Sequence, residues 1–346
     1  MQTPSKADWD RFFLIAGGHS AFQLLWSGVE LGLFDKLAAE PGLDLPQLAT
    51  RLGLELYPAR VLIVGLTAVG LIEKRGEGFH NAPVSQHALV TGSEANLAAV
   101  LGWQAHIVYP GMMDFTQSLR ESKNVGLDRF SGPGNTLYQR LAAQPKLERV
   151  FQAAMSSLSL SANRHVATAI DWGRFKHVVD AGGGDGTNAI ALATRYPALR
   201  VTVMDSPTVC ALAREKIAVA GLADRVKTHA GDFRRDAFPA DADAVLFCHI
   251  FTIFSMEHNR ELLAKCAREL PSGGSVVLFN MMGADDDTGP MSTALGSPYF
   301  LAIATGEGML HAGKDYAEAM RATGFKELHR VTGLPLDHGV LFGTKG

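Results

Sequence analysis

Three acidic residues in the second half of the chain each stand where a short apolar run ends. Asp180 opens the pattern Asp-x-Gly-x-Gly-x-Gly, Asp205 follows the run 201–204, and Gly231-Asp232-Phe233 closes the run 226–230. Glycines allow a backbone to approach a ligand closely, and a carboxylate after the second strand can accept hydrogen bonds from both hydroxyls of a ribose. Three such signals at consecutive strand ends predict a binding site for a nucleotide-like ligand.

A strand, a turn and a helix must hold these residues in place. Residues 177–180 contain a β-branched run, and the helical pattern 189–193 follows the glycines directly. This order is typical of an open α/β sheet that binds its ligand at the carboxyl ends of the strands, where the next helix offers free N–H groups. The dinucleotide pattern would need a small residue in the sixth place from Gly182, where Thr187 stands. The acid-first spacing therefore indicates a different nucleotide-like ligand.

Strands and helices continue to alternate after Asp205. We expect strands at 243–250 and 275–279, helices at 256–267 and 314–323, and a closing hairpin from 328–333 and 339–343. Alternating elements of this kind predict an α/β fold with a seven-stranded, Rossmann-like sheet.

The first part of the chain reads as helical. Residues 8–38 carry apolar side chains nearly all round a predicted helix, which predicts burial against a second subunit. Prolines at two plausible helix starts and a strand–turn–strand at 71–80 give the order of a winged helix. The segment 45–65 holds only Arg51 and Arg60, too few basic residues for a helix that tracks DNA phosphates. The wing is therefore expected to be scaffold.

Residues 96–163 interleave aromatic and polar side chains on predicted helices and immediately precede the sheet. A substrate roof should lie there. We therefore predict two domains. Residues 1–171 form a helical dimerisation and substrate-roof domain with a winged-helix-like segment, and residues 172–346 form the domain that binds the cofactor.

The composition excludes several classes of protein. A net charge of −3 over 346 residues argues against a nucleic-acid partner or a membrane surface. The three cysteines are widely spaced and form neither a disulfide framework nor a zinc pattern, so no metal is expected. No signal peptide opens the chain, and the longest strongly apolar run, 244–254, is too short to span a bilayer. We expect a soluble cytoplasmic protein.

Together these features resemble the small-molecule O-methyltransferase family, whose members are class I S-adenosylmethionine (SAM) methyltransferases. The resemblance rests on the glycine pattern, the helical first half, Asp205-Ser206-Pro207, Gly231-Asp232-Phe233 and the turn 271–274, and it spans residues 10–345. It implies SAM as cofactor, a small metabolite as acceptor and a homodimer. The predicted cofactor contacts are Asp180, Gly182, Gly184, Asp205, Asp232, Phe233, Cys248 and Met155. The predicted substrate contacts are Trp103, His106, Tyr109, Tyr138, Phe151 and Met309.

The chain departs from this family where the acceptor's proton is handled. Plant members carry His-Asp-Trp-Ser-Asp-Glu-His after the fourth strand, and its first His removes the hydroxyl proton. Here that segment begins Thr252-Ile253, and a family Glu that orients the base falls at about Leu310. A phenol or alcohol needs a base, whereas a thioether sulfur, a tertiary amine or an enol-type carbon already offers an electron pair. We therefore expect no general base, with Thr252, His249 and His311 as candidates for positioning the acceptor.

Among acceptors that need no base, a thioether is the favoured prediction. The stretches 17–26 and 103–111 resemble the bacterial methylthiohydroxybutyrate S-methyltransferases of dimethylsulfoniopropionate synthesis. Catalysis would then depend on proximity and orientation. One alternative is O- or N-methylation of an aromatic metabolite with His249 or His311 as base. Another is a SAM-fold protein that binds without methylating, as a regulator or a pericyclic catalyst.

Overall fold

The computed structural model describes residues 3–346, apart from the side chains of Ser161 and Asn163. By its contacts the chain divides into two units, Met1–Ile107 with Arg149–Ser157, and Val108–Glu148 with Leu158–Gly346. Residues 108–148 and 158–171, which we expected in the N-terminal domain, thus belong to the unit that contains the sheet. The predicted division into domains between residues 171 and 172 stays a prediction.

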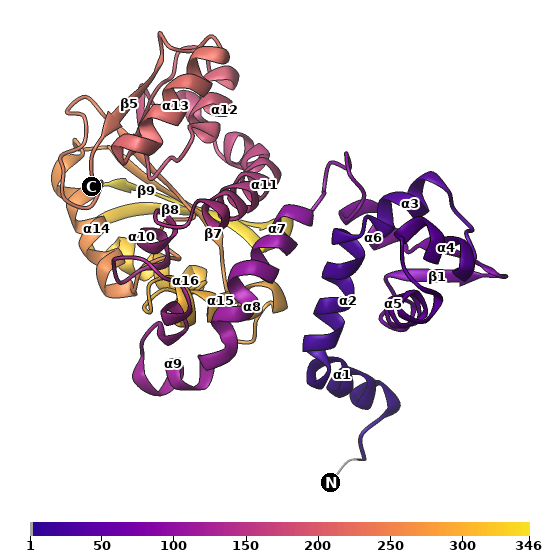
Figure 1. The fold of residues 1–346 in the computed structure, drawn as a ribbon. Coiled ribbons are helices and arrows are strands. Elements are labelled where there is room, and N and C mark those ends of the chain that lie inside the picture. Colours follow the sequence, from indigo (N-terminus) through magenta and orange to yellow (C-terminus); the bar gives the residue numbers. More distant parts are fainter. Residues whose placement is uncertain (1–2) are drawn as a thin grey trace. The chain divides into compact units, whose positions relative to one another are not determined.

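A seven-stranded sheet is the centre of the second unit, as predicted (Figure 1). Its spatial order is β5-β4-β3-β6-β7-β9-β8. Neighbouring strands from β5 to β7 are parallel, and β9 runs antiparallel between β7 and β8. The strands are β3 (His177–Ala181), β4 (Arg200–Asp205), β5 (Val226–Ala230), β6 (Ala244–Cys248), β7 (Ser275–Met281), β8 (Phe325–Leu334) and β9 (His338–Lys345).

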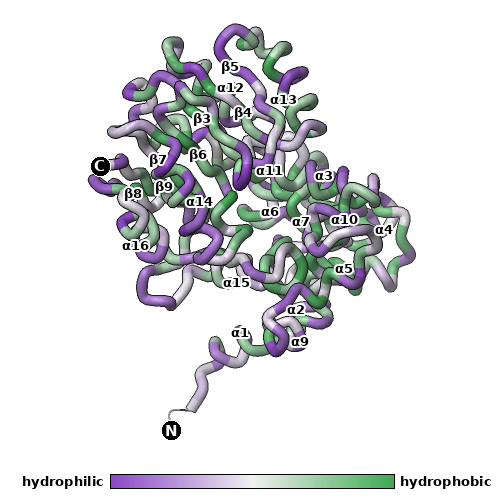
Figure 2. The backbone as a smooth tube through the Cα atoms, turned by 90° about the vertical axis from the view of Figure 1, so that its left-hand side faces the viewer, coloured by the Kyte–Doolittle hydropathy of each residue, from purple (hydrophilic) through white to green (hydrophobic). Residues whose placement is uncertain are grey.

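Helices cover both faces of this sheet. Every residue of β3 and β6 is buried, and both strands are largely hydrophobic in Figure 2, as expected for central parallel strands. One core contains side chains from α11, α12 and α13, and the other contains side chains from α14 and α16. The helices are α11 (Pro145–Ala169), α12 (Thr187–Arg195), α13 (Pro207–Val219), α14 (Met256–Glu269), α15 (Met291–Tyr299) and α16 (Gly313–Ala322).

The segment 108–148 consists of short helices rather than long ones. It contains α8 (Tyr109–Gly111), α9 (Phe115–Glu121) and α10 (Leu137–Leu141), with 3-10 turns at Met112–Asp114 and Val125–Arg129. A π-helical turn, Phe300–Ala304, extends α15 and contacts α9 and α10. The prediction of helical structure over 96–163 is confirmed for most of these residues, but with many interruptions.

The first unit contains three successive helices where we predicted a single helix over 8–38. The helices α1 (Lys6–Ala16) and α2 (Gly18–Glu30) are separated at Gly17, and α3 (Leu33–Ala39) starts after Gly32, whose φ is +68°. Glycine adopts this left-handed backbone without steric cost, so the helix ends there. The single-helix prediction was therefore wrong, because apolar periodicity outweighed two glycine breaks.

The remaining elements of this unit follow the predicted order. They are α4 (Leu45–Leu52), α5 (Leu56–Ala68), a hairpin of β1 (Ile72–Arg75) and β2 (Gly78–Asn81), α6 (Pro83–Ala88), α7 (Ala98–Trp103) and a π-helical turn at Gln104–Val108. Two helices followed by a two-stranded hairpin match the expected sequence of elements. The classification of this segment as a winged helix stays a prediction.

Glycines allow α2 to pack very closely against its neighbours in the first unit. A Cβ placed at Gly65 of α5 would lie 2.5 Å from Leu24, and one at Gly28 would lie 2.9 Å from the Phe34 ring. A Cβ at Gly102 of α7 would lie 3.4 Å from the Trp26 ring, which is ordinary van der Waals contact. Because protein interiors are close-packed, an added methyl group at either of the first two positions would require the Leu24 or Phe34 side chain to shift.

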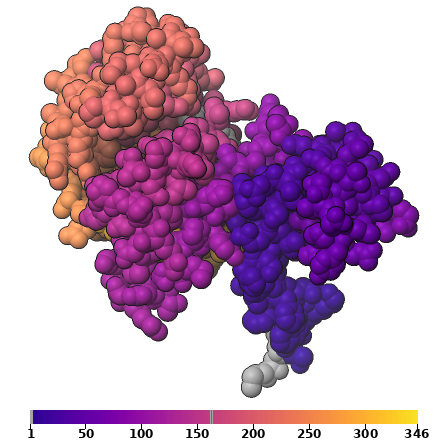
Figure 3. Space-filling model, in the orientation of Figure 1, coloured from indigo at the N-terminus to yellow at the C-terminus, as the bar shows by residue number. Residues whose placement is uncertain are grey.

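Helix α1 presents an exposed apolar surface. Five of its large apolar side chains are 50% to 73% exposed, namely Trp9, Phe12, Phe13, Leu14 and Ile15. In Figure 3 the start of the chain projects from the rest of the first unit. Among the described residues, no single helix has the length and apolar composition to cross a membrane, although α1 and α2 meet that test as a pair bent by 70°. A contiguous apolar surface of this kind is typical of an interface.

We propose that α1 and α2 join two copies of this chain. Light scattering at micromolar concentration should give twice the mass of one chain. Replacing Phe12 and Ile15 together with aspartate should give a monomer, because two charges would be buried without partners. Leu212→Asp, at an exposed leucine of α13, is the matched control and should leave the mass unchanged. A wild-type monomer with normal activity would contradict the proposal.

Candidate active site

The glycine turn between β3 and α12 has the backbone that the motif predicts. Gly182, Gly184 and Gly186 all have positive φ, between +58° and +80°, and Gly186 caps the amino end of α12. A Cβ at Gly182 would lie 2.4 Å from Ile250, so the turn excludes a larger residue there. The turn therefore places its backbone at the carboxyl edge of the sheet, where the N–H groups of Gly182 and Gly184 donate to the Met204 carbonyl and to Asp205.

Asp180 is a fully buried carboxylate without a partner. Neither of its oxygens has a hydrogen-bond partner among the residues that the structure describes. Burial, and secondarily the negative charges of Asp205 and Asp185, raises the pKa of Asp180 to about 7. A buried, unpaired acid is costly in the free protein. This geometry suits a ligand that brings a positive charge, such as an ammonium group.

Asp205 connects the end of β4 to the glycine turn. Its Oδ2 accepts a hydrogen bond from the Gly184 N–H at 3.0 Å, and its Oδ1 accepts one from the Ser206 N–H at 2.7 Å. Burial raises the pKa of Asp205, and these two hydrogen bonds oppose the rise. Each oxygen retains a second acceptor site, so the carboxylate can still receive two ribose hydroxyls.

The third predicted acid closes β5 and is held by an arginine. Arg234 donates to both oxygens of Asp232, at 3.0 and 2.9 Å, and this hydrogen bonding lowers the pKa of Asp232. Phe233 packs edge-on against Phe247 of β6, with ring centroids 6.2 Å apart. An apolar ring beside a carboxylate suits an aromatic base that carries an amino group.

Cys248 ends β6 beside these acids. Its thiol is buried, and burial together with the charge of Asp180 raises its pKa, so it stays protonated at neutral pH. The predicted cofactor residues on β3, β4, β5 and β6 thus share one edge of the sheet. Met155 belongs to the first unit, and its predicted contact with the cofactor stays a prediction.

No group that could remove a proton stands at the two family positions for the base. The Thr252 side chain is buried and its hydroxyl donates to the carbonyl of His249 at 3.1 Å. Leu310, where the family Glu would stand, is buried as well. A hydroxyl that donates to a neighbouring carbonyl can still accept a hydrogen bond from the methyl acceptor, but it is too weak a base to deprotonate it.

His249 is buried in a left-handed backbone conformation, with φ of 58°. Its ring packs edge-on against Phe279 and His338, with centroid distances of 5.3 and 5.0 Å. Burial, and secondarily the charge of His338, lowers the pKa of His249 to about 3. His249 is therefore neutral at physiological pH and a poor base.

His311 is also buried, rather than facing solvent as one of our expectations allowed. Its Nε2 lies 3.3 Å from the carbonyl of Phe254, and burial lowers its pKa below the ordinary value. The Gly283 N–H donates to the carbonyl of His311, so this loop is tied to the end of β7. His311 thus lies close to the segment 252–258, where related enzymes carry the base, but its lowered pKa does not favour proton abstraction.

The predicted substrate residues belong to both units. Tyr109, Tyr138 and Met309 lie in the second unit, and burial raises the pKa of Tyr138 to about 12. Met309 is 46% exposed. Trp103, His106 and Phe151 lie in the first unit, where His106 packs edge-on against Trp26 at 5.4 Å. Their contacts with substrate stay predictions.

Asn280 near the end of β7 is a candidate that our sequence reasoning missed. It is fully buried, and neither its Nδ2 nor its Oδ1 has a hydrogen-bond partner among the described residues. A buried amide is normally paired, so an orphaned one near the binding edge is a candidate for ligand contact. The signal was available, because Asn280 interrupts the apolar run 276–279.

The sheet order and the acids at its edge define a class I SAM-dependent methyltransferase. Residues 114–326 match the model of the O-methyltransferase domain family. The chain is 37% identical over 341 residues to the L-tyrosine C(3)-methyltransferase of Streptomyces lavendulae, covering 98% of this chain and 93% of that protein. It is 33% identical over 332 residues to the 3-hydroxy-5-methyl-1-naphthoate 3-O-methyltransferase of Streptomyces sahachiroi, covering 96% and 94%. The protein belongs to the O-methyltransferase domain family.

Solved structures agree with this assignment. The SAM-dependent methyltransferase SibL, in its apo form, has a TM-score of 0.86 and 37% identity, covering 97% of this chain and 98% of that one. Human N-acetylserotonin methyltransferase, solved in complex with SAM, has a TM-score of 0.83 over the full length of both chains. At 23% identity, the second likeness supports the fold alone. The protein is an enzyme of the methyltransferase class, which disfavours the non-methylating alternative.

SAM is the cofactor, and the residues at the sheet edge fit it. The orphaned carboxylate of Asp180 suits the ammonium of its methionine end, Asp205 suits its ribose, and Asp232 with Phe233 suits its adenine. When bound, SAM supplies the methyl group. Which of the predicted residues contact it stays a prediction.

The ribose contact can be tested directly. Asp205→Ala should weaken SAM binding by about 1.5–3 kcal/mol, the scale of hydrogen bonds to a charged group, which is roughly 10- to 150-fold in Kd. Calorimetric titration measures this change, and a melting curve shows whether the variant is folded. Unchanged affinity in a folded variant would refute the assignment of Asp205 to the ribose.

Proposed function

We propose that the protein transfers the methyl group of SAM to a phenolic aromatic metabolite, with the ring carbon next to the hydroxyl as the favoured acceptor atom. The two relatives described above act, by their names, on tyrosine and on a hydroxynaphthoate, and both compounds are phenols. The more similar of the two is named as a carbon methyltransferase. These names support our aromatic alternative better than the thioether acceptor.

The observation that carries the choice of atom is the missing base. The Thr252 hydroxyl donates to the His249 carbonyl, Leu310 is apolar, and burial lowers the pKa of His249 to about 3. Methylation of the hydroxyl needs that oxygen deprotonated before or during transfer. The ring carbon attacks with π electrons that the hydroxyl enriches, so the reacting atom does not have to lose a proton first.

The reaction balances without a further reactant. A pair of ring π electrons forms the new carbon–carbon bond to the methyl group, and the methyl–sulfur bond breaks to leave S-adenosylhomocysteine. The ring carbon then loses its hydrogen as a proton to water, which restores the aromatic ring. The chain's contribution is to hold the ring carbon in line with the methyl–sulfur bond.

A competition assay tests the proposal. We would incubate the protein with SAM and equal amounts of L-tyrosine, a hydroxynaphthoate and 4-methylthio-2-hydroxybutyrate, and analyse products by mass spectrometry. A phenol should be consumed. With ring-deuterated phenol, methylation on carbon should release one deuteron per S-adenosylhomocysteine formed. Full retention of deuterium in the product would show methylation of the hydroxyl, and turnover of the thioether alone would refute a phenolic acceptor.

A further inference from the structure

Asn280, the second-last residue of β7, is a polar side chain at the end of an apolar run. Its exposed fraction is 0%, and within residues 3–346 neither its amide Nδ2 nor its Oδ1 has a hydrogen-bond partner. Leaving a buried amide unpaired is costly, so such groups in native proteins normally meet water or a ligand. Because β7 runs parallel to β6 and β6 to β3, Asn280 lies near the same carboxyl edge of the sheet as the glycine turn.

The Asn280 side chain faces the side of the sheet that α14 and α16 cover. Phe279 belongs to the core that contains α11, α12 and α13, whereas Leu278 belongs to the core that contains α14 and α16. Because successive side chains of a strand point to opposite faces, Asn280 shares the face of Leu278. Its partner on β9 is Gly339, which has no side chain, and His249 after β6 packs its ring against Phe279 on the opposite face. Neither neighbouring strand therefore offers the amide a polar side chain.

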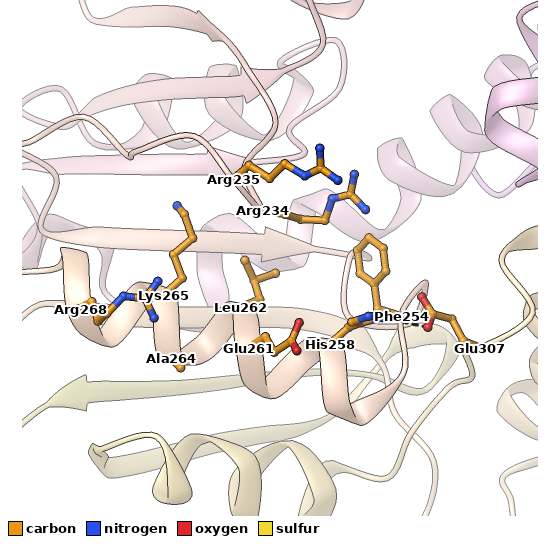
Figure 4. A pocket seen from close by; sticks show the side chains of 10 residues that line it. All are labelled: Arg234, Arg235, Phe254, His258, Glu261, Leu262, Ala264, Lys265, Arg268 and Glu307. Atoms are coloured by element: carbon orange, nitrogen blue, oxygen red, sulfur yellow. Dashed lines mark ion pairs between the residues drawn. The ribbon is translucent and has the colours of Figure 1, made fainter. Parts of the chain in front are cut away.

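The loop 305–312 is tied to the segment that follows β6. The Thr305 hydroxyl donates to the Ile253 carbonyl at 2.6 Å. Glu307 forms an ion pair with His258 of α14, with 2.8 Å between its Oε2 and the histidine Nδ1 (Figure 4). These two contacts hold one end of the loop beside the segment 252–258.

The other end of this loop is tied to the end of β7. The Gly283 N–H, three residues after Asn280, donates to the His311 carbonyl at 2.9 Å. The loop therefore spans the ends of β6 and β7, near Thr252 and Asn280, and it carries Met309, which we predict to contact the acceptor. In the sheet order, β7 lies beyond β6 from the strands whose acids we assign to SAM. Asn280 is thus on the side of the binding edge where we expect the acceptor.

We propose that the Asn280 amide binds the hydroxyl of the phenolic acceptor and so selects phenols over rings that lack this group. The inference rests on the proposed function, because it assigns a partner to the hydroxyl of that acceptor. The amide Oδ1 accepts the hydrogen bond that the hydroxyl donates. A ring without the hydroxyl leaves the buried amide unpaired, and a site built in this way rejects such a ring.

An amide in this place also fits methylation on carbon. A carboxamide oxygen accepts a hydrogen bond, but it is far too weak a base to remove the proton of a phenol. The hydroxyl therefore keeps its proton and stays a poor nucleophile, while its electrons still enrich the neighbouring ring carbon. Asn280 thus acts by positioning the acceptor and takes no part in proton transfer.

Calorimetric titration with two matched pairs of compounds tests the proposal. L-tyrosine is compared with L-phenylalanine, and 3-hydroxy-2-naphthoate with 2-naphthoate, so that only the hydroxyl differs within each pair. The full-length protein is first saturated with S-adenosylhomocysteine, which fills the cofactor site and prevents turnover. We expect the wild type to bind at least one phenol about tenfold or more tightly than its counterpart, the scale of a hydrogen bond to a group that is otherwise left unpaired.

Asn280→Leu replaces the amide with an apolar side chain of similar size. The variant should bind the phenol and its counterpart with similar affinity. It should also melt at a higher temperature than the wild type in the cofactor-free form, because it removes an unpaired buried amide. Leu278→Met is the control, since it conserves volume on the same face of the same strand and should keep the preference for the hydroxyl.

The results separate this inference from the proposed function. A preference for the hydroxyl that is the same in the wild type, Asn280→Leu and Leu278→Met would overturn the role of Asn280 and would not affect the phenolic acceptor. A wild type that binds a phenol and its counterpart equally would also overturn the role of Asn280 alone. Absence of binding by both phenols would overturn the phenolic acceptor and this inference together.

Discussion

Replacing Asp180 with asparagine should weaken SAM binding about a hundredfold and make the cofactor-free protein more stable above neutral pH. The buried carboxylate lacks a partner, so an ammonium group gains strongly from pairing with it. Removing one member of a buried charge pair typically costs about 3–5 kcal/mol, and the remaining amide oxygen recovers part of this loss. Calorimetric titration measures the loss of affinity.

The stability effect has a definite sign. Burial raises the pKa of Asp180 from its ordinary value of 3.8 to about 7, so protonation is easier in the folded state than in the unfolded one. Asp180 therefore costs no stability below its unfolded pKa, and stability is lost as pH rises from about 4 through 7. This rise in the pKa corresponds to a loss of roughly 4 kcal/mol in the free energy of unfolding. Asp180→Asn removes this loss, so its melting temperature should exceed that of the wild type more at pH 8 than at pH 5.

The same pKa predicts the pH dependence of SAM binding. Below pH 7 the ligand must displace a proton from Asp180. The Kd for SAM should therefore rise about tenfold for each unit by which the pH falls below 7. Asp224→Asn, at an exposed aspartate, is the control and should change neither affinity nor its pH dependence. A Kd that does not vary between pH 5 and 8 would show that Asp180 does not hold the ammonium.

The rate of methyl transfer should show no titration of a histidine. His249 and His311 are buried, and burial lowers the pKa of both. We expect single-turnover rates, at saturating SAM and acceptor, to have no inflection near pH 6.5. His249→Gln and His311→Gln should retain the wild-type rate within about threefold, whereas loss of a general base costs about 10²–10⁴-fold.

If the rate of methyl transfer rises with pH, a change of acceptor shows whether the titrating group belongs to the acceptor or to the protein. If phenolate is the reactive form, the rate rises toward the pKa of the phenol and the midpoint moves when a more acidic phenol is used. A limb that belongs to the protein does not move with the acceptor. A midpoint near pH 6.5 that is the same for both phenols and disappears in one histidine variant would contradict the base-free reading. The enzyme would then be a base-assisted O-methyltransferase.

The binding edge of the sheet was predictable because its signals are local. Asp180 and Asp205 lie at the carboxyl ends of β3 and β4, Asp232 comes shortly after β5, and parallel strands bring these ends to one edge. The breaks at Gly17 and Gly32 were also encoded locally, but we gave apolar periodicity more weight than the glycines. Where a signal is contained in ten residues, sequence reasoning was sufficient in principle.

The environment of the histidines was not predictable in this way. His249 owes its low pKa to a fully buried position against Phe279 and His338, and the last of these is 89 residues away in the chain (338 − 249). His311 is likewise buried through contact with Phe254, from a different loop. Burial by partners distant in sequence depends on tertiary packing, which a single sequence without an alignment does not specify.

The close helix contacts in the first unit bear on how this enzyme could be engineered. Trp103 ends α7 and His106 lies in the turn that follows it, while Gly102 of α7 faces Trp26. Gly65 and Gly28 allow the close packing of α2 with its neighbours. A mutagenesis library aimed at new acceptors should vary the two aromatic residues and keep all three glycines fixed. Alanine at Gly65 or Gly28 would displace the side chain of Leu24 or Phe34. On our prediction that Trp103 and His106 contact the acceptor, we expect this displacement to change acceptor preference through α2, without a direct contact. Screens would record such variants as remote specificity mutations.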